Sequence, residues 1–227
     1  MKLEKRNIDT FETNLGKIAF SLTSLSNSRL NKEDKSILIE TNGHLIEIIA
    51  FDDIKKWTKD TNPIETAFGW IVRILKTNDL KEKISIECSL SPINEEITSD
   101  IDTGEFLDSL CIENETDVIS IGTEDGEMMK YRSEKEDWMP LRFKNLLGYQ
   151  SNSEFSFTSY LKFGLQTNLP ELVKGEKVYF HYLIATDKRR KSKEYPKEDD
   201  ISTYLAVDFP KRTLIERLKK KEKITKC

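Results

Sequence analysis

Residues 36–51, SILIETNGHLIEIIAF, place a two-residue turn signal between two β-prone segments. The dipeptide Asn42-Gly43 is the strongest short-range signal for a hairpin, because both residues of a tight turn need positive φ, and we expect it at Asn42 and Gly43. Such a turn sets Ile39 opposite Ile46, and the next isoleucine pair aligns in the same way. One face of the hairpin is then apolar and the other is half polar. The segment therefore predicts an antiparallel hairpin that is covered on one side.

The segment after this hairpin, residues 62–76 (NPIETAFGWIVRILK), predicts a helix. Asn62 can cap it, and Pro63 suits the first helical position. The spacing i, i+3, i+4, i+7 is that of an amphipathic helix. The apolar residues that show this spacing are Ile64, Ala67, Phe68, Ile71, Val72 and Leu75. We expect a helix over 63–77 that packs on the sheet.

Two further hairpins are expected, over 117–132 with Asp125-Gly126 at its tip and over 178–209. Residues 83–90 alternate and predict a strand, whereas 105–112 (EFLDSLCI) are expected to form a short helix or turn. Pro210 is expected to open a basic helix at the C-terminus. The predicted fold class is α+β, with antiparallel hairpins packed against one amphipathic helix.

Charge is distributed unevenly along the chain. From Ser151 onward there are 17 Lys and Arg against 11 Asp and Glu, a net of +6, whereas the first 150 residues hold 19 basic and 29 acidic residues, a net of −10. The polar stretch 149–154 coincides with this shift. We expect an acidic part, 1–150, and a basic part, 151–227, which form two subdomains or one continuous domain.

Composition indicates a cytoplasmic bacterial protein. The chain has no run of about 18 apolar residues and no apolar segment after its charged N-terminus, so neither a membrane span nor a signal peptide is expected. Three widely spaced cysteines argue against a disulfide framework and fit a reducing compartment. The abundance of Lys, Ile, Asn, Glu and Ser is typical of AT-rich genomes.

The stretch 187–200, DKRRKSKEYPKEDD, lies between two apolar alternating runs. We expect residues 188–201 to be the long connection of the third hairpin, and connections of this length are functional or disordered. The first half is basic and the second mostly acidic, so the two arms can neutralise each other in part. Candidate phosphate-binding or partner-binding residues are Lys188, Arg189, Arg190, Lys191, Lys193, Lys211, Arg212, Lys219 and Lys220.

No motif specific for catalysis occurs in the sequence. In the simplest register of the third hairpin His181 faces Asp208, a pair able to orient an imidazole, but a buried structural histidine is the favoured interpretation. Asp117 and Glu127, with Lys130, are weaker candidates for the metal ligands of a nuclease. The sequence contains no Cys/His spacing for zinc and no Walker A, GxGxxG or GxSxG motif, so no cofactor is expected. Trp138, in a polar setting, is the best candidate for an exposed partner anchor.

These observations favour a non-enzymatic interaction protein that binds a macromolecule through its charged faces. The acidic part would suit a basic partner and the basic part an acidic one. Bacterial immunity, inhibitor and antiphage components include chains of this size and charge. This is an analogy with a class of proteins and not a match to any of them. The alternative is a nucleic-acid-binding protein or metal-dependent nuclease that uses the basic stretch 188–193.

Overall fold

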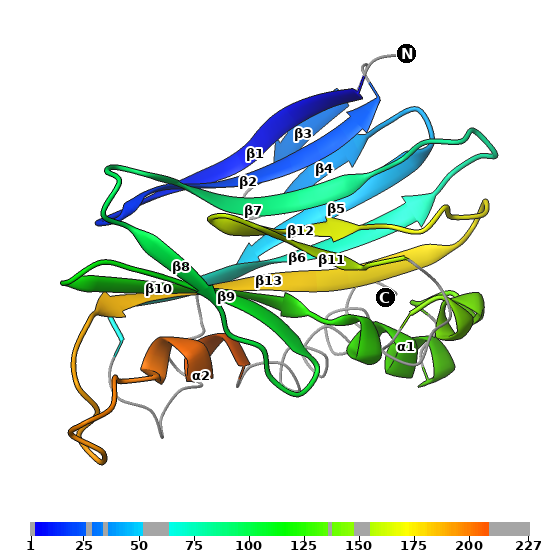
Figure 1. Ribbon diagram of the computed structural model, residues 1–227. Coiled ribbons are helices and arrows are strands. Elements are labelled where there is room, and N and C mark those ends of the chain that lie inside the picture. The colour runs from blue at the N-terminus through cyan, green and yellow to red at the C-terminus, as the bar shows by residue number, and fades with distance from the viewer. Residues whose placement is uncertain are drawn as a thin grey trace.

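The computed structural model describes residues 3–25, 29–33, 36–51, 64–135, 138–147 and 155–208, which form two antiparallel sheets and a few helices (Figure 1). The smaller sheet runs, in spatial order, β1 (Leu3–Thr13), β2 (Gly16–Leu25), β7 (Ser85–Pro92), β12 (Gly164–Asn168) and β11 (Thr158–Leu161). The larger sheet runs β3 (Arg29–Glu33), β4 (Ser36–Glu40), β5 (His44–Phe51), β6 (Thr66–Lys76), β13 (Lys177–Lys188), β10 (Asp117–Glu124), β9 (Leu107–Glu113) and β8 (Thr98–Ile101). The described helices are α1 (Gly126–Lys135), the 3₁₀ helix η2 (Leu141–Asn145) and α2 (Ser202–Asp208). The mixed α+β class thus holds, with antiparallel sheet as its main component.

The main core lies between the two sheets. Alternate residues of β2, such as Ile18 and Phe20, are buried against alternate residues of β6 and β13, such as Val72 and Phe180. A second, smaller cluster lies on the opposite face of the larger sheet, where Val207 of α2 covers β10 and β13. The central strands of the larger sheet are therefore buried on both faces.

The hairpin predicted over 36–51 is present as β4 and β5. Ile39 pairs with Ile46 and Ile37 with Ile48, in the predicted register. The prediction of positive φ at Asn42 and Gly43 was wrong, because neither residue is in that region. The turn is instead stabilised by side chains, since Thr41 Oγ1 and the Glu82 carboxylate accept the Gly43 N–H at 3.3 and 2.9 Å.

The helix predicted over 63–77 is wrong, because Thr66–Lys76 forms β6, between β5 and β13. Trp70 and Val72 face the main core, while Ala67 and Ile71 face the second cluster. A strand buried on both faces carries apolar residues without strict alternation, and this pattern happens to match the helical spacing.

The hairpin predicted over 117–132 is also wrong. Residues 117–124 form β10, which is paired on both sides, and the chain then enters α1. Asp125 caps this helix, because its Oδ1 accepts the Met128 N–H at 2.8 Å. An Asp-Gly pair suits a hairpin tip, but Asp is equally a preferred helix cap.

The third predicted hairpin is half correct. Val178–Asp187 lies within β13, but Ser202–Asp208 is the helix α2. Asp200 Oδ1 accepts the Ser202 N–H at 2.8 Å, which fixes the chain at the start of the helix. The predicted pairing of His181 with Asp208 is wrong, because His181 pairs in the sheet with Ile71.

Two shorter predictions differ in outcome. Residues 83–90 do enter a strand, β7, whereas 105–112 are not helical, because Leu107–Glu113 is β9. The helix expected from Pro210 lies outside the described residues. None of the described helices has the length and apolar character that crossing a membrane requires.

Each of the two sheets contains strands from before and from after the charge shift at 149–154. β11 and β12 extend the smaller sheet, and β13 lies between β6 and β10 in the larger one. The division into 1–150 and 151–227 stays a prediction about independent folding.

Candidate partner-binding site

The loop of residues 188–201, here called the tongue, connects β13 to α2 and extends beyond the end of β13 (Figure 1). It has a regular backbone, with an antiparallel bridge between Lys191 and Asp199. The Ser192 N–H donates to the Glu198 carbonyl at 2.8 Å, and the Asp200 N–H donates to the Arg190 carbonyl at 2.9 Å. The tongue is thus a short hairpin rather than an irregular loop.

Ion pairs within the tongue and to its base fix this hairpin. Arg190 bridges Asp187 at 2.6 Å and Asp200 at 2.7 Å. The other pairs are Lys188–Asp117 at 2.6 Å, Lys191–Asp199 at 2.6 Å, Arg189–Asp199 at 3.2 Å and Arg189–Glu113 at 3.4 Å. The expected mutual neutralisation of the two arms is present, and four of the five predicted tongue cations are engaged in ion pairs.

The pKa values of Asp117, at the base of the tongue, and of Asp200, within it, reflect these contacts. Burial alone raises the pKa of Asp117, but hydrogen bonds from Lys188, Thr116 and Asn14 outweigh it, so the pKa lies below its usual value. Burial also raises the pKa of Asp200. Hydrogen bonds from Ser202 and Arg190 outweigh that effect, so this pKa too lies below its usual value. Both groups are therefore charged at neutral pH, as the ion pairs require.

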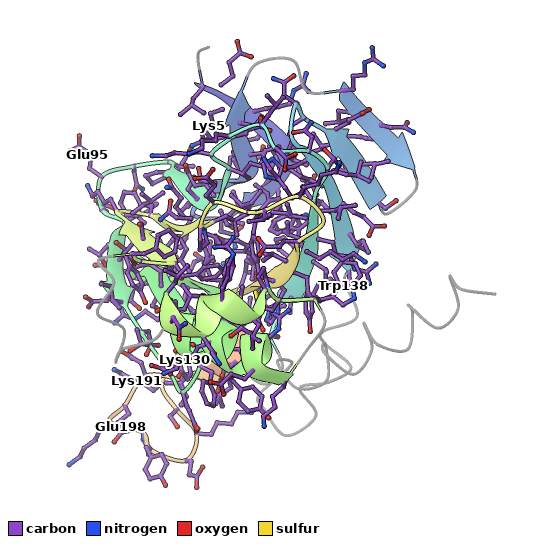
Figure 2. All side chains as sticks on the ribbon, turned by 90° about the vertical axis from the view of Figure 1, so that its right-hand side faces the viewer. Lys5, Glu95, Lys130, Trp138, Lys191 and Glu198 are labelled. Carbon is purple, nitrogen blue, oxygen red and sulfur yellow. The ribbon has the colours of Figure 1, made fainter. Side chains whose placement is uncertain are left out.

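The tip of the tongue presents exposed side chains to solvent. Tyr195 is 57% exposed, and Lys193, the fifth predicted tongue cation, is exposed beside it. Figure 2 shows Lys191 and Glu198 on the projecting loop, away from the body of the two sheets. An aromatic side chain held out on a fixed hairpin contributes little to this chain's own core.

Two cavities lie beside β1 and β6, and the smaller one reaches the end of β13 at Asp187, next to the tongue. A cavity of about 140 Å³ is lined by four carboxylate side chains, from Glu12, Glu65, Asp117 and Asp187. A second cavity of about 450 Å³ is mainly aromatic and has Asp9 in its wall. Phe11 and Thr66 line both, so the cavities adjoin.

Several predicted site residues lie elsewhere or have other roles. Trp138 is half-buried rather than an exposed anchor, because its ring packs edge-on against Tyr179 at 6.2 Å, with Arg73 and Lys177 over it. In Figure 2 it lies on a different side of the molecule from the tongue. The predicted residues Lys211, Arg212, Lys219 and Lys220 lie outside the described residues.

The candidate metal ligands are not brought together. Asp117 begins β10 and Glu127 lies in the first turn of α1, beyond the other end of that strand, roughly 25 Å away at 3.3 Å per residue. Among the residues that the structure describes, no group of three or more His, Cys, Asp or Glu side chains could hold a metal ion.

A buried charged cluster, which no sequence pattern indicated, lies at the opposite end of β10. Arg132 Nη1 donates to Glu124 Oε2 at 2.7 Å, and the guanidinium lies 3.3 Å from the centre of the Tyr179 ring. His181 Nδ1 lies 3.5 Å from the same Glu124 oxygen. All these side chains are buried, which favours the structural role predicted for His181.

Comparisons of this chain with protein families, with curated proteins and with solved structures find no match.

Proposed function

We propose that this chain is a non-enzymatic interaction protein of the cytoplasm that binds a macromolecular partner through the tongue. The single observation that carries the proposal is the exposure of Tyr195 at the tip of a hairpin fixed by ion pairs. Ordering a loop costs conformational entropy, and here the ordered tip buries no large apolar side chain of the chain itself. A preordered loop lowers the entropic cost of binding, and tyrosine is a preferred interface anchor.

A protein partner is favoured over a nucleic acid. Lys188, Arg190 and Lys191 are already paired with carboxylates, so phosphate would have to displace those partners. The tip itself alternates in sign, with Lys193 and Lys197 beside Glu194 and Glu198. Mixed charge of this kind suits a protein surface rather than a uniformly anionic backbone.

The test is photo-crosslinking from the tip of the tongue. A photoreactive phenylalanine analogue replaces Tyr195 in one variant and Tyr131 in the other, because Tyr131 is 52% exposed but lies on α1. We expect the variant labelled at 195 to capture one discrete protein in its source cells, and the variant labelled at 131 not to capture it. The purified partner should then bind the wild-type chain.

A loop deletion provides the second arm. Replacing residues 192–198 with Asn-Gly keeps the bridge between Lys191 and Asp199 but removes the tip. Loss of partner binding with an unchanged melting temperature supports the proposal. Unchanged binding rejects the tongue as the site, and capture of nucleic acid instead of protein would establish the alternative function.

A further inference from the structure

The aromatic cavity between β1, β5 and β6 has the chemistry of a cation-binding site. Phe11, Phe51, Phe68 and Trp70 line its wall together with the carboxylate of Asp9. Its volume of about 450 Å³ lies within the range of roughly 300–1,000 Å³ typical of ligand pockets. Among the described residues that line it there is no lysine, arginine or histidine.

A β-bulge in β1 directs Asp9 toward this cavity. Asn7 pairs with Ser21 and Asp9 with Phe20, so Ile8 is the extra residue of the bulge. Because directly paired residues share a face of the sheet, Asp9 lies on the same side as the buried Phe20, between the sheets. The bulge therefore places a carboxylate at the edge of the core, where an apolar residue would ordinarily lie.

Trp70 positions the carboxylate. Its Nε1–H donates to Asp9 Oδ2 at 3.0 Å, while Asp9 Oδ1 accepts the Thr10 N–H at 2.9 Å. The Trp70 ring is itself fixed by stacking on Phe20, with ring centres 4.5 Å apart. Each carboxylate oxygen has a second lone pair, so Asp9 can still accept two hydrogen bonds from one guanidinium group.

The phenylalanine rings provide the second half of the site. Phe68 lies 4.3 Å from Phe11 and meets Trp70 edge-on at 5.3 Å, measured between ring centres. Phe11 and Phe68 are both half-buried, so part of each ring is open to the cavity. A planar guanidinium stacks on aromatic rings while its N–H groups reach a carboxylate, which an ammonium group does less well.

We propose that this cavity binds an arginine side chain of a basic protein partner. The proposal rests on the proposed function. In it, the partner that binds the tongue also contacts the acidic part of the chain, through this cavity. The adjoining cavity adds carboxylates, of which Asp117 and Asp187 are paired with Lys188 and Arg190, and Glu12 with Lys17 at 3.3 Å. Among the described residues that line the aromatic cavity itself, Asp9 is the only acidic one, so it supplies the charge that attracts the arginine.

The experiment uses the full chain and two short peptides, acetyl-Gly-Arg-Gly-amide and its citrulline counterpart. Citrulline keeps the shape of arginine but has no charge. The signal of the Trp70 indole N–H is followed by NMR and is assigned by its loss in Trp70→Phe. We expect a saturable shift with the arginine peptide below about 10 mM and none with the citrulline peptide.

Variants separate the site from general charge attraction. Asp9→Asn keeps an oxygen that can accept the Trp70 N–H, and it should weaken binding of the arginine peptide about tenfold or more. Phe68→Leu keeps the apolar volume but removes the ring, and it should weaken binding several-fold. The control Glu4→Gln removes an exposed carboxylate from the same strand and should leave binding unchanged.

Either of two results overturns the proposal: equal shifts with the arginine and citrulline peptides, or unchanged binding in both Asp9→Asn and Phe68→Leu. Melting temperatures of the variants show that they are folded. The variant with Asn-Gly in place of 192–198 should still bind the arginine peptide, so failure of the tongue and failure of the cavity are distinguishable.

Discussion

The guanidinium of Arg132 donates to the carboxylate of Glu124 at 2.7 Å, and both side chains are wholly excluded from solvent. The pair joins the end of β10 to the second turn of α1. Burying two charges is costly unless each compensates the other, so the pair makes the position of α1 depend on β10.

Arg132→Met should lower the free energy of unfolding by about 3–5 kcal/mol, because it deprives the buried Glu124 carboxylate of its guanidinium partner. The double variant Glu124→Gln, Arg132→Met should be less destabilised than the single one, because no charge then remains at the pair. Urea denaturation of the three proteins measures the difference. Equal stability of wild type and Arg132→Met would show that the pair contributes nothing.

The turn between β4 and β5 should depend on pH through Glu82. Burial raises the pKa of Glu82, but hydrogen bonds from His44, Thr41 and the Gly43 N–H outweigh it, so the folded pKa lies below its ordinary value of 4.5. A carboxylate with a lowered pKa stabilises the fold above its unfolded pKa and ceases to do so as pH falls through its folded pKa. The stability difference between wild type and Glu82→Gln should therefore be largest at neutral pH and shrink below about 4.5. Denaturation curves at several pH values test this, and a difference independent of pH would contradict it.

Two glycines should differ in their tolerance of a methyl group. A Cβ at Gly69 would lie 2.4 Å from the Tyr182 carbonyl oxygen in the adjacent strand, which cannot move without breaking the sheet. A Cβ at Gly122 would meet side chains, with Val207 of α2 at 3.0 Å and Leu107 at 3.1 Å. We expect Gly122→Ala to cost about 1–3 kcal/mol and Gly69→Ala to cost more. If thermal denaturation showed Gly122→Ala to be the more destabilising of the two, the result would argue against the close pairing of β6 with β13.

The tongue should loosen when its central ion pairs are removed. Arg190→Gln loses the bridge to Asp187 and Asp200, so hydrogen exchange at the Ser192 amide, which closes the hairpin, should become faster. Lys193→Gln, at an exposed position of the same hairpin, should leave the exchange rate unchanged. Equal exchange in both variants would mean that the backbone bridge alone maintains the hairpin.

Acid should have the same effect as Arg190→Gln. The pKa of Asp200 is lowered from its ordinary value of 3.8, so the stability it gives to the tongue is present above that pH and is lost as pH falls through the lowered pKa. Faster cleavage of the tongue by pepsin at pH 2.5 than at pH 4.5, relative to a site in the sheets, would agree with this. Because pepsin itself is faster in acid, the ratio of the two cleavage rates is the quantity to compare.

Local sequence signals were sufficient for those elements whose structure follows from a pattern of neighbouring residues. The hairpin of β4 and β5 followed from alternation around Asn42-Gly43, and its register was predicted correctly because a slip of one residue would turn its isoleucines to solvent. The mutual neutralisation of the tongue followed from the charges of 188–200, since oppositely charged arms of one loop can reach each other without any contact distant in sequence.

Tertiary structure decided what local patterns left ambiguous. Thr66–Lys76 is a strand because neighbours pair with both its edges and apolar layers cover both its faces, and none of these contacts is local in sequence. The Asp125-Gly126 dipeptide caps a helix because β10 already has strand partners on both sides. Asp9 and Trp70, or Glu124 and His181, meet only across strands that are distant in sequence. The sequence by itself therefore determined which faces are apolar and which loop is charged, whereas the partners of each strand, and with them the aromatic cavity, depend on contacts that exist only once both sheets have formed.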